Sequence, residues 1–163
     1  MKRSKWIAVA FAMATSGTAL AHGDKPHAAK PQDRPISTEE KAFGREGDPE
    51  RVTRTIRIDM SDTMRFTPDT LHVKRGEIVR FEVTNRGKTL HEMVLGTLKD
   101  LQEHAALMRK LPQMEHDEPY VAHVAPGKTA RIVWNFDKPG EFYYGCLVPG
   151  HLEAGMVGRI VVR

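Results

Sequence analysis

Three side chains that bind soft metal ions follow one another at five-residue steps near the C-terminus: Cys146, His151 and Met156. A thiolate, an imidazole and a thioether together favour copper over zinc or calcium. Pro149-Gly150 predicts a turn, so a strand ending at Cys146 and a strand resuming near Met156 would fold the three donors back around one point. This spacing predicts a site for a single metal ion.

A second histidine would complete a set of two histidines and one cysteine with a weak axial methionine, which suits copper. His91 is the best candidate, because it follows the turn-like residues 85–89 and directly precedes the strand-like Met93-Val94-Leu95. Loops collect at the ends of a sandwich, so this loop position can lie beside Cys146. Four other histidines compete for the role: His72, His104, His116 and His123.

Residues 1–21 have the pattern of a cleavable secretory signal peptide. Basic residues open the segment, an apolar run covers residues 6–14, and Ala19-Leu20-Ala21 resembles a cleavage site. The apolar run is too short for a permanent span and no later segment approaches about 20 apolar residues, so we expect no stable membrane insertion. An uncleaved N-terminal anchor is the alternative. We therefore expect export to the periplasm.

Cys146 is the only cysteine of the chain, so it has no disulfide partner within it. In an oxidising compartment a free thiol is explained by a bound metal or by an intermolecular disulfide. The formal net charge of +4 falls by three when Lys2, Arg3 and Lys5 are removed with the signal peptide. The mature chain, from His22, carries no clustered basic stripe, so we predict no nucleic-acid partner.

The 163 residues, 40% of them apolar, suit one domain. Residues 22–50 hold several prolines among charged residues and almost nothing large and apolar, which predicts a flexible leader before a domain at 51–163. Short strand-like runs separated by turn residues predict an all-β Greek-key sandwich. The expected strands are Arg51–Ile58, Met64–Val73, Glu77–Thr84, Met93–Leu95, Lys128–Phe136, Glu141–Gly145 and Val157–Val162.

One stretch breaks the strand pattern and predicts a short helical insertion that ends at Pro112. Thr97-Leu98-Lys99-Asp100 resembles a capping box. The apolar residues at helical spacing are Leu98, Leu101, Ala105, Met108 and Leu111. Trp134 and Phe136 are expected core aromatics.

The run Cys146-Leu147-Val148-Pro149-Gly150-His151, followed by Met156 and preceded by a distant histidine, resembles the cupredoxins, the family of plastocyanin, azurin and rusticyanin. The resemblance covers residues 51–163 and implies a type 1 copper site. Its motif positions give His91, Cys146, His151 and Met156 as the copper ligands. Within the family, the chain is most similar to periplasmic cupredoxins associated with copper tolerance.

The chain departs from the family at Glu92, where familiar members often have Asn or Ser that ties the ligand loops together. A carboxylate there either favours Cu(II) and lowers the reduction potential or points to solvent. Further His and Met residues raise the question of accessory copper sites. These residues are His22, His27, Met60, Met64, His104, Met114, His116 and His123, whereas Met108 is expected in the helix core.

We predict a monomeric protein that binds or redox-cycles copper in copper tolerance, and a soluble one-electron carrier is the alternative. Leu147, Val148, Pro149 and Leu152 would surround the His151 edge with apolar surface where a redox protein could dock. No enzymatic activity is expected. A Cys/His hydrolase leaves Met156 unexplained, copper oxidases and nitrite reductases need more metal centres, and a binuclear centre needs two cysteines.

Overall fold

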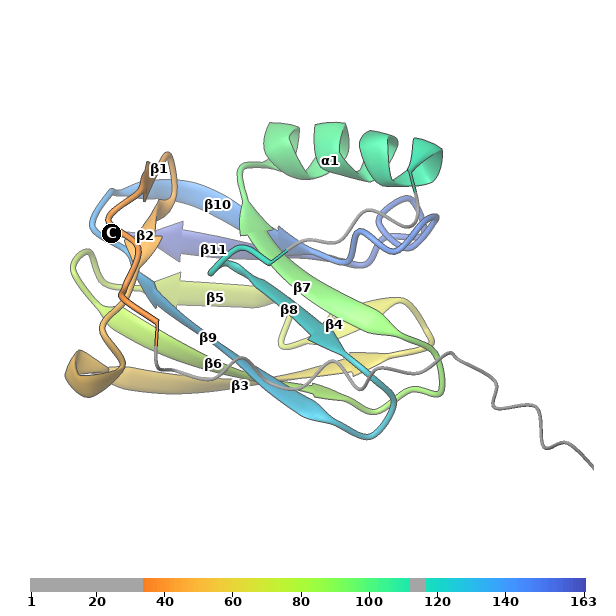
Figure 1. The fold of residues 1–163 in the computed structure, drawn as a ribbon, viewed down its shortest axis with the longest axis horizontal. Helices are drawn as coiled ribbons and strands as arrows, with labels where there is room; N and C mark the ends of the chain where they lie inside the picture. Colours follow the sequence, from red (N-terminus) through yellow and green to blue (C-terminus); the bar gives the residue numbers. More distant parts are fainter. Residues whose placement is uncertain (1–33, 112–116) are drawn as a thin grey trace, which may run out of the picture.

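The computed structural model describes residues 34–111 and 117–163, which form two β-sheets with one α-helix on the outside (Figure 1). The predicted signal peptide, the candidate accessory ligands His22 and His27, and the rest of the leader up to residue 33 lie outside the described residues. Pro112, Met114 and His116 also lie outside them. The predicted all-β sandwich with one helical insertion is confirmed.

One sheet has six strands in the order β1-β2-β9-β6-β3-β4, and the other has five in the order β5-β11-β10-β7-β8. The strands of the first sheet are β1 (Glu40–Lys41), β2 (Gly44–Glu46), β3 (Arg54–Ser61), β4 (Arg65–Thr67), β6 (Ile78–Asn85) and β9 (Thr129–Asn135). Those of the second are β5 (Thr70–Val73), β7 (His91–Gly96), β8 (Val121–Val124), β10 (Gly140–Gly145) and β11 (Val157–Val162). The β3–β6 and β5–β11 pairs are parallel, and the other pairs are antiparallel.

Alternation along β6 shows why these strands form a sandwich. The side chains of Val79, Phe81 and Val83 are fully buried, while Arg80 and Glu82 between them are only half-buried. Successive side chains of a strand point to opposite faces, so the apolar set faces the other sheet. The inner faces of both sheets share one core, which contains the predicted core aromatics Trp134 and Phe136.

The helix α1 (Leu98–Lys110) covers the outer face of the five-stranded sheet over β7 and β10 (Figure 1). Its predicted capping box is present, because Thr97 and Asp100 exchange side-chain to backbone hydrogen bonds. The buried helix residues Leu101, Ala105 and Met108 form a second core with sheet and loop residues, among them Val94, Val121 and Leu147. No helix in the described parts of the chain is both long and apolar enough to cross a bilayer.

Two details of the strand prediction were wrong. The expected strand Met64–Val73 is two strands in different sheets, β4 and β5, because Pro68 stands between them and cannot donate to a strand ladder. The four-residue strand β8 was missed. Of the apolar residues at helical spacing, Leu98 and Leu111 lie at the helix ends and are 39% and 53% exposed.

Part of the predicted flexible leader is packed on the sandwich. This segment contains β1 and β2, and the 3₁₀ turn η1 (Pro49–Arg51) follows them. The strand β2 pairs with β9. Phe43 is 4% exposed and stacks on Trp134 at 5.2 Å, while Trp134 Nε1 donates to the Phe43 carbonyl at 2.8 Å. Residues 22–50 hold two large apolar residues, Ile36 and Phe43, and Phe43 anchors the hairpin because it is buried against Trp134.

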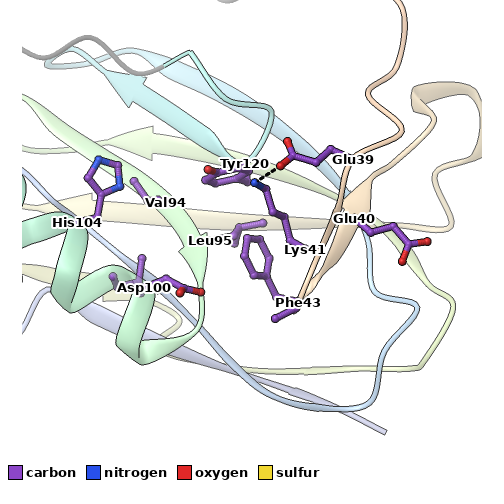
Figure 2. Close-up of a pocket in the computed structure, with 11 residues that line it drawn as sticks. Glu39, Glu40, Lys41, Phe43, Val94, Leu95, Asp100, His104 and Tyr120 are labelled. Atoms are coloured by element: carbon purple, nitrogen blue, oxygen red, sulfur yellow. Dashed lines mark hydrogen bonds and ion pairs between the residues drawn. The ribbon is translucent and has the colours of Figure 1, made fainter.

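A hollow separates this hairpin from α1. Figure 2 shows Glu39 and Lys41 beside Tyr120 on one side, with Asp100 and His104 of α1 on the other. The Lys41 ammonium pairs with Glu39 and lies 5.4 Å from the centre of the Tyr120 ring. The hairpin therefore contacts Tyr120, the residue just before β8 of the five-stranded sheet, as well as β9.

Candidate metal centre

The loop between β10 and β11 carries three of the four predicted donors. Cys146 directly follows β10, and its N–H donates to the Met156 carbonyl at 3.1 Å, which extends the β10–β11 ladder by one bond. His151 lies on a turn in which its N–H donates to Val148 O, and its carbonyl accepts from Met156 N, both at 3.0 Å. These short-range bonds close the loop and bring its two ends together.

His91 reaches this loop from another part of the sheet. It is the first residue of β7 and is fully buried, whereas the sequence placed it in a loop. The preceding turn is shaped by buried Asn85, whose Nδ2 donates to Thr89 O and Val124 O, both at 2.8 Å. The Asn85 Oδ1 accepts from Gly87 N at 2.8 Å. These bonds set where β7 begins.

The structure brings His91, Cys146 and His151 together, with one donor atom of each within 4.8 Å of the others. Cys146 Sγ lies 3.3 Å from His151 Nδ1 and 4.0 Å from His91 Nδ1. Two donors of one first-row metal ion, each bound at about 2.0–2.3 Å, lie about 3–4 Å apart. Met156 is fully buried in the core cluster that also contains Cys146. The spacing and softness of these donors fit one copper ion.

Burial makes the Cys146 thiol hard to ionise without a metal. Desolvation raises its pKa to about 12, and the negative charge of Glu92 adds to this effect. The backbone N–H groups of Glu92 and Val148 oppose it by donating to the sulfur, the former at 3.4 Å. The metal-free protein therefore holds a neutral thiol at neutral pH, and a bound cation would make the thiolate favourable.

His151 is half-buried, and burial is the largest cause that lowers its pKa, followed by the nearby His91. The two imidazole rings lie 5.0 Å apart between their centres. A lowered pKa keeps the His151 ring neutral at neutral pH, which is the form that binds metals. Of the three side chains in this group, His151 is the one that reaches the surface.

Asp62 belongs to the site but was missed by the sequence analysis. Its Oδ1 lies 3.0 Å from His91 Nε2, the ring nitrogen that faces away from Cys146. The N–H of Lys88, at 2.7 Å, is the largest cause that holds the pKa of Asp62 well below its usual range. No local motif marks this residue, because only the β3–β6 pairing brings it beside the His91 turn.

Comparison with known proteins decides the family. Residues 52–163 match the family model of copper binding proteins of the plastocyanin/azurin family. The chain is a cupredoxin. Family membership, fold and donor set together give it one type 1 copper.

Relatives of this cupredoxin include proteins named for copper resistance. It is 53% identical over 121 residues to the copper-resistant cuproprotein CopI of Rubrivivax gelatinosus, covering 74% of this chain and 73% of that protein. CopI of Pseudomonas aeruginosa is 33% identical over 152 residues, covering 76% of this chain and 83% of that protein. Reduced auracyanin from Roseiflexus castenholzii shares the fold, with a TM-score of 0.59 at 18% identity over 69% of this chain and 98% of auracyanin.

Glu92, where this cupredoxin departs from familiar members, does not point to solvent. Its side chain is 3% exposed, and Oε2 lies 3.0 Å from Nδ1 of His123. Glu92 and His123 are direct cross-strand partners on β7 and β8, which explains the contact. His123 is therefore paired with Glu92 and does not join the group of His91, Cys146 and His151.

The other His and Met residues of this cupredoxin are dispersed. Met60 and Met108 are buried in the two cores, Met64 packs against the first core, and His72 is exposed on β5. His104 lines the hollow beside the hairpin. Within residues 34–111 and 117–163, no second group of three metal-binding His, Cys, Asp or Glu side chains is present. Accessory copper sites stay a prediction.

Leu147 was predicted on the apolar surface around His151, and this was wrong. It is 1% exposed and packs into the core under α1. Val148 and Leu152 are half-buried and Pro149 is exposed. The loop leaves β10 beneath the helix, so its first apolar residue points inward and the later ones remain at the surface.

Proposed function

We propose that this cupredoxin holds its copper through His91, Cys146, His151 and Met156 and acts in copper tolerance outside the cytoplasm. The meeting of three metal-binding side chains on a chain 53% identical to a copper-resistant cuproprotein carries the proposal. Binding copper, with or without redox cycling, is the proposed activity.

The protein's contribution is to keep the donors in place. When bound, copper supplies a one-electron couple between Cu(I) and Cu(II). His91 and Cys146 are fully buried, and backbone bonds join Cys146 to Met156 and Met156 to His151. Donors held in this way need little rearrangement when the copper gains or loses an electron.

A soluble one-electron carrier is the second candidate function. The observation that favours it is the partial exposure of His151, with half-buried Val148 and Leu152 beside it in the sequence. A redox protein docking there would meet the one surface-reaching donor of the group. We propose no catalysis of an organic substrate, because the buried Cys146 thiol with its raised pKa is unsuited to nucleophilic attack.

Periplasmic location and a monomeric state belong to the same proposal. The proposed location rests on two features of the sequence. Residues 1–21 have a signal-peptide pattern, and Cys146 is a lone cysteine whose thiol would be bound to copper in an oxidising compartment. Copper is the proposed partner, and nucleic acid and membrane insertion are not expected.

Deletion of the gene tests the function. We expect deletion to make cells sensitive to copper while respiration stays normal, and a plasmid copy to restore tolerance. A Cys146→Ser copy should fail to restore it, whereas a His72→Ala copy should succeed, because His72 lies outside the cluster. Unchanged copper tolerance with a respiratory defect would overturn the proposal in favour of the electron carrier.

A further inference from the structure

The carboxylate of Asp62 contacts the buried candidate ligand His91 at the ring nitrogen that faces away from Cys146. The His91 ring is fully buried, and its Nε2 lies 3.0 Å from Asp62 Oδ1. A carboxylate only accepts hydrogen bonds, so Nε2 carries the proton and donates it. The free electron pair is then on Nδ1, the atom that lies 4.0 Å from Cys146 Sγ. The contact fixes the tautomer that a metal beside Cys146 needs.

Asp62 cannot easily turn away from His91. Its Oδ2 accepts from Lys88 N at 2.7 Å, and its Oδ1 accepts from Thr89 Oγ1 at 2.9 Å and from Thr89 N at 3.3 Å. Gly87 lets the turn approach this closely, because a Cβ at that position would overlap Asp62 Oδ1. The carboxylate is thus oriented by the same turn that leads into β7.

We propose that Asp62 is a positioning residue that, through His91, biases the copper of this protein toward Cu(II). The inference rests on the proposed function, since it needs His91 as a ligand. Hydrogen bonding to a carboxylate raises the basicity of a metal-bound imidazole. The added negative charge stabilises the doubly charged ion more than the singly charged one. Copper at this site therefore accepts an electron less readily than it would with a neutral acceptor behind His91.

The decisive variant is Asp62→Asn, which keeps an acceptor oxygen and removes the charge. Removing a group that is hydrogen-bonded to a metal ligand typically lowers metal affinity by about 10–100-fold. Because the Asp62 side chain is 38% exposed and partly screened, we expect the lower end, a loss of about tenfold in Cu(II) affinity relative to Cu(I). For one electron, that loss raises the reduction potential by about 59 mV. Redox titration of the visible copper band measures the shift.

Asp59→Asn is the matched control, because it makes the same charge change three residues earlier on β3. Asp59 pairs with Arg86 at 3.1 Å and is 48% exposed. We expect its potential to equal that of the unaltered protein. Thr89→Val removes one of the hydrogen bonds that orient Asp62 but keeps the negative charge, so it should shift the potential by less than Asp62→Asn does. A Thr89→Val shift as large as that of Asp62→Asn would overturn a role for the carboxylate itself.

Pulsed electron paramagnetic resonance of the Cu(II) protein gives a second readout. It detects the outer nitrogen of each copper-bound imidazole, whose quadrupole coupling follows the hydrogen bond made there. Asp62→Asn should change one such nitrogen, and Asp59→Asn should change none. If Asp62→Asn keeps both the potential and the coupling of the control, the inference fails while the proposed copper centre stands. If the unaltered protein forms no copper band, the centre fails and the inference with it.

Discussion

The thiol of Cys146 lies in surroundings that favour its charged form only when a cation is present. It is fully buried, its pKa is raised to about 12, and the N–H groups of Glu92 and Val148 point at the sulfur. Those two donors would stabilise a thiolate once a metal had displaced the proton. The residue is therefore prepared for metal binding rather than for exposed thiol chemistry.

The Cys146→Ser variant tests whether the sulfur of Cys146 binds the copper, because it replaces that one atom by oxygen. Addition of Cu(II) to the purified protein should produce an intense visible absorption from thiolate to copper, and the serine variant should lack it. Serine preserves the shape of the side chain but offers no soft donor. Absorption spectra during copper titration measure the effect. A band of unchanged intensity in Cys146→Ser would contradict the ligand assignment.

Two histidine variants control the same experiment. His91→Ala should weaken or shift the copper band, because it removes one member of the buried cluster. His72→Ala should leave the band unchanged, because His72 is exposed on β5 and belongs to no such cluster. An unaltered spectrum in His91→Ala would show that another residue completes the site.

The helix α1 supports the loop that carries the donors. A Cβ at Gly145, the residue before Cys146, would lie 2.9 Å from Leu152 Cδ1 and 3.4 Å from Leu101 Cδ1. The end of β10 is thus packed between the helix and the far part of its own loop. Arg109, near the end of the helix, also pairs with Glu153 of that loop. The helical insertion is therefore part of the framework of the copper site.

Leu101→Ala should destabilise the folded protein by about 2–5 kcal/mol, the usual cost of truncating a buried leucine. Leu101 is 1% exposed, so its removal leaves a cavity between α1 and β10. Leu107→Ala, on the same helix but 40% exposed, should change stability by no more than about 0.5 kcal/mol. Denaturant unfolding of the metal-free proteins measures both, and equal values would show that α1 is not packed as described.

The sandwich as a whole includes more of the chain than the family match. The β1–β2 hairpin precedes residues 52–163, yet Phe43 fills a place against Trp134 and packs edge-on to Tyr120 at 5.6 Å. Trp134 in turn satisfies its indole N–H with the Phe43 carbonyl. The hairpin thus covers one end of the core and adds two strands to the larger sheet.

Phe43→Ala should lower the free energy of unfolding by about 3–5 kcal/mol, the range for a buried phenylalanine. The copper band should be unchanged, because the hairpin holds none of the cluster residues. Ile36→Ala is the control, since Ile36 is 43% exposed and should matter by about 0.5 kcal/mol or less. Unfolding of copper-free protein followed by tryptophan fluorescence measures the difference. Equal stability of the two variants would place the hairpin outside the cooperative unit.

Local spacing by itself determined which residues of the β10–β11 loop meet. Cys146, His151 and Met156 lie within eleven positions, and short-range bonds such as Cys146 N to Met156 O close the loop. The helix α1 was equally accessible, because its capping box and its buried stripe are properties of neighbouring residues. Geometry of this kind depends on residues that are close together in the sequence, so residue order is enough to predict it.

Only the tertiary structure decided the rest. His91 had competitors until the β7–β10 pairing brought it to Cys146, and Asp62 reaches it through the parallel pairing of β3 with β6. Glu92 meets His123 because β7 and β8 pair in that register. Register between distant strands depends on how the whole set of apolar faces packs together. Spacing along the chain does not reveal this register. The contacts of Asp62 with His91 and of Glu92 with His123 therefore could not be predicted from the sequence.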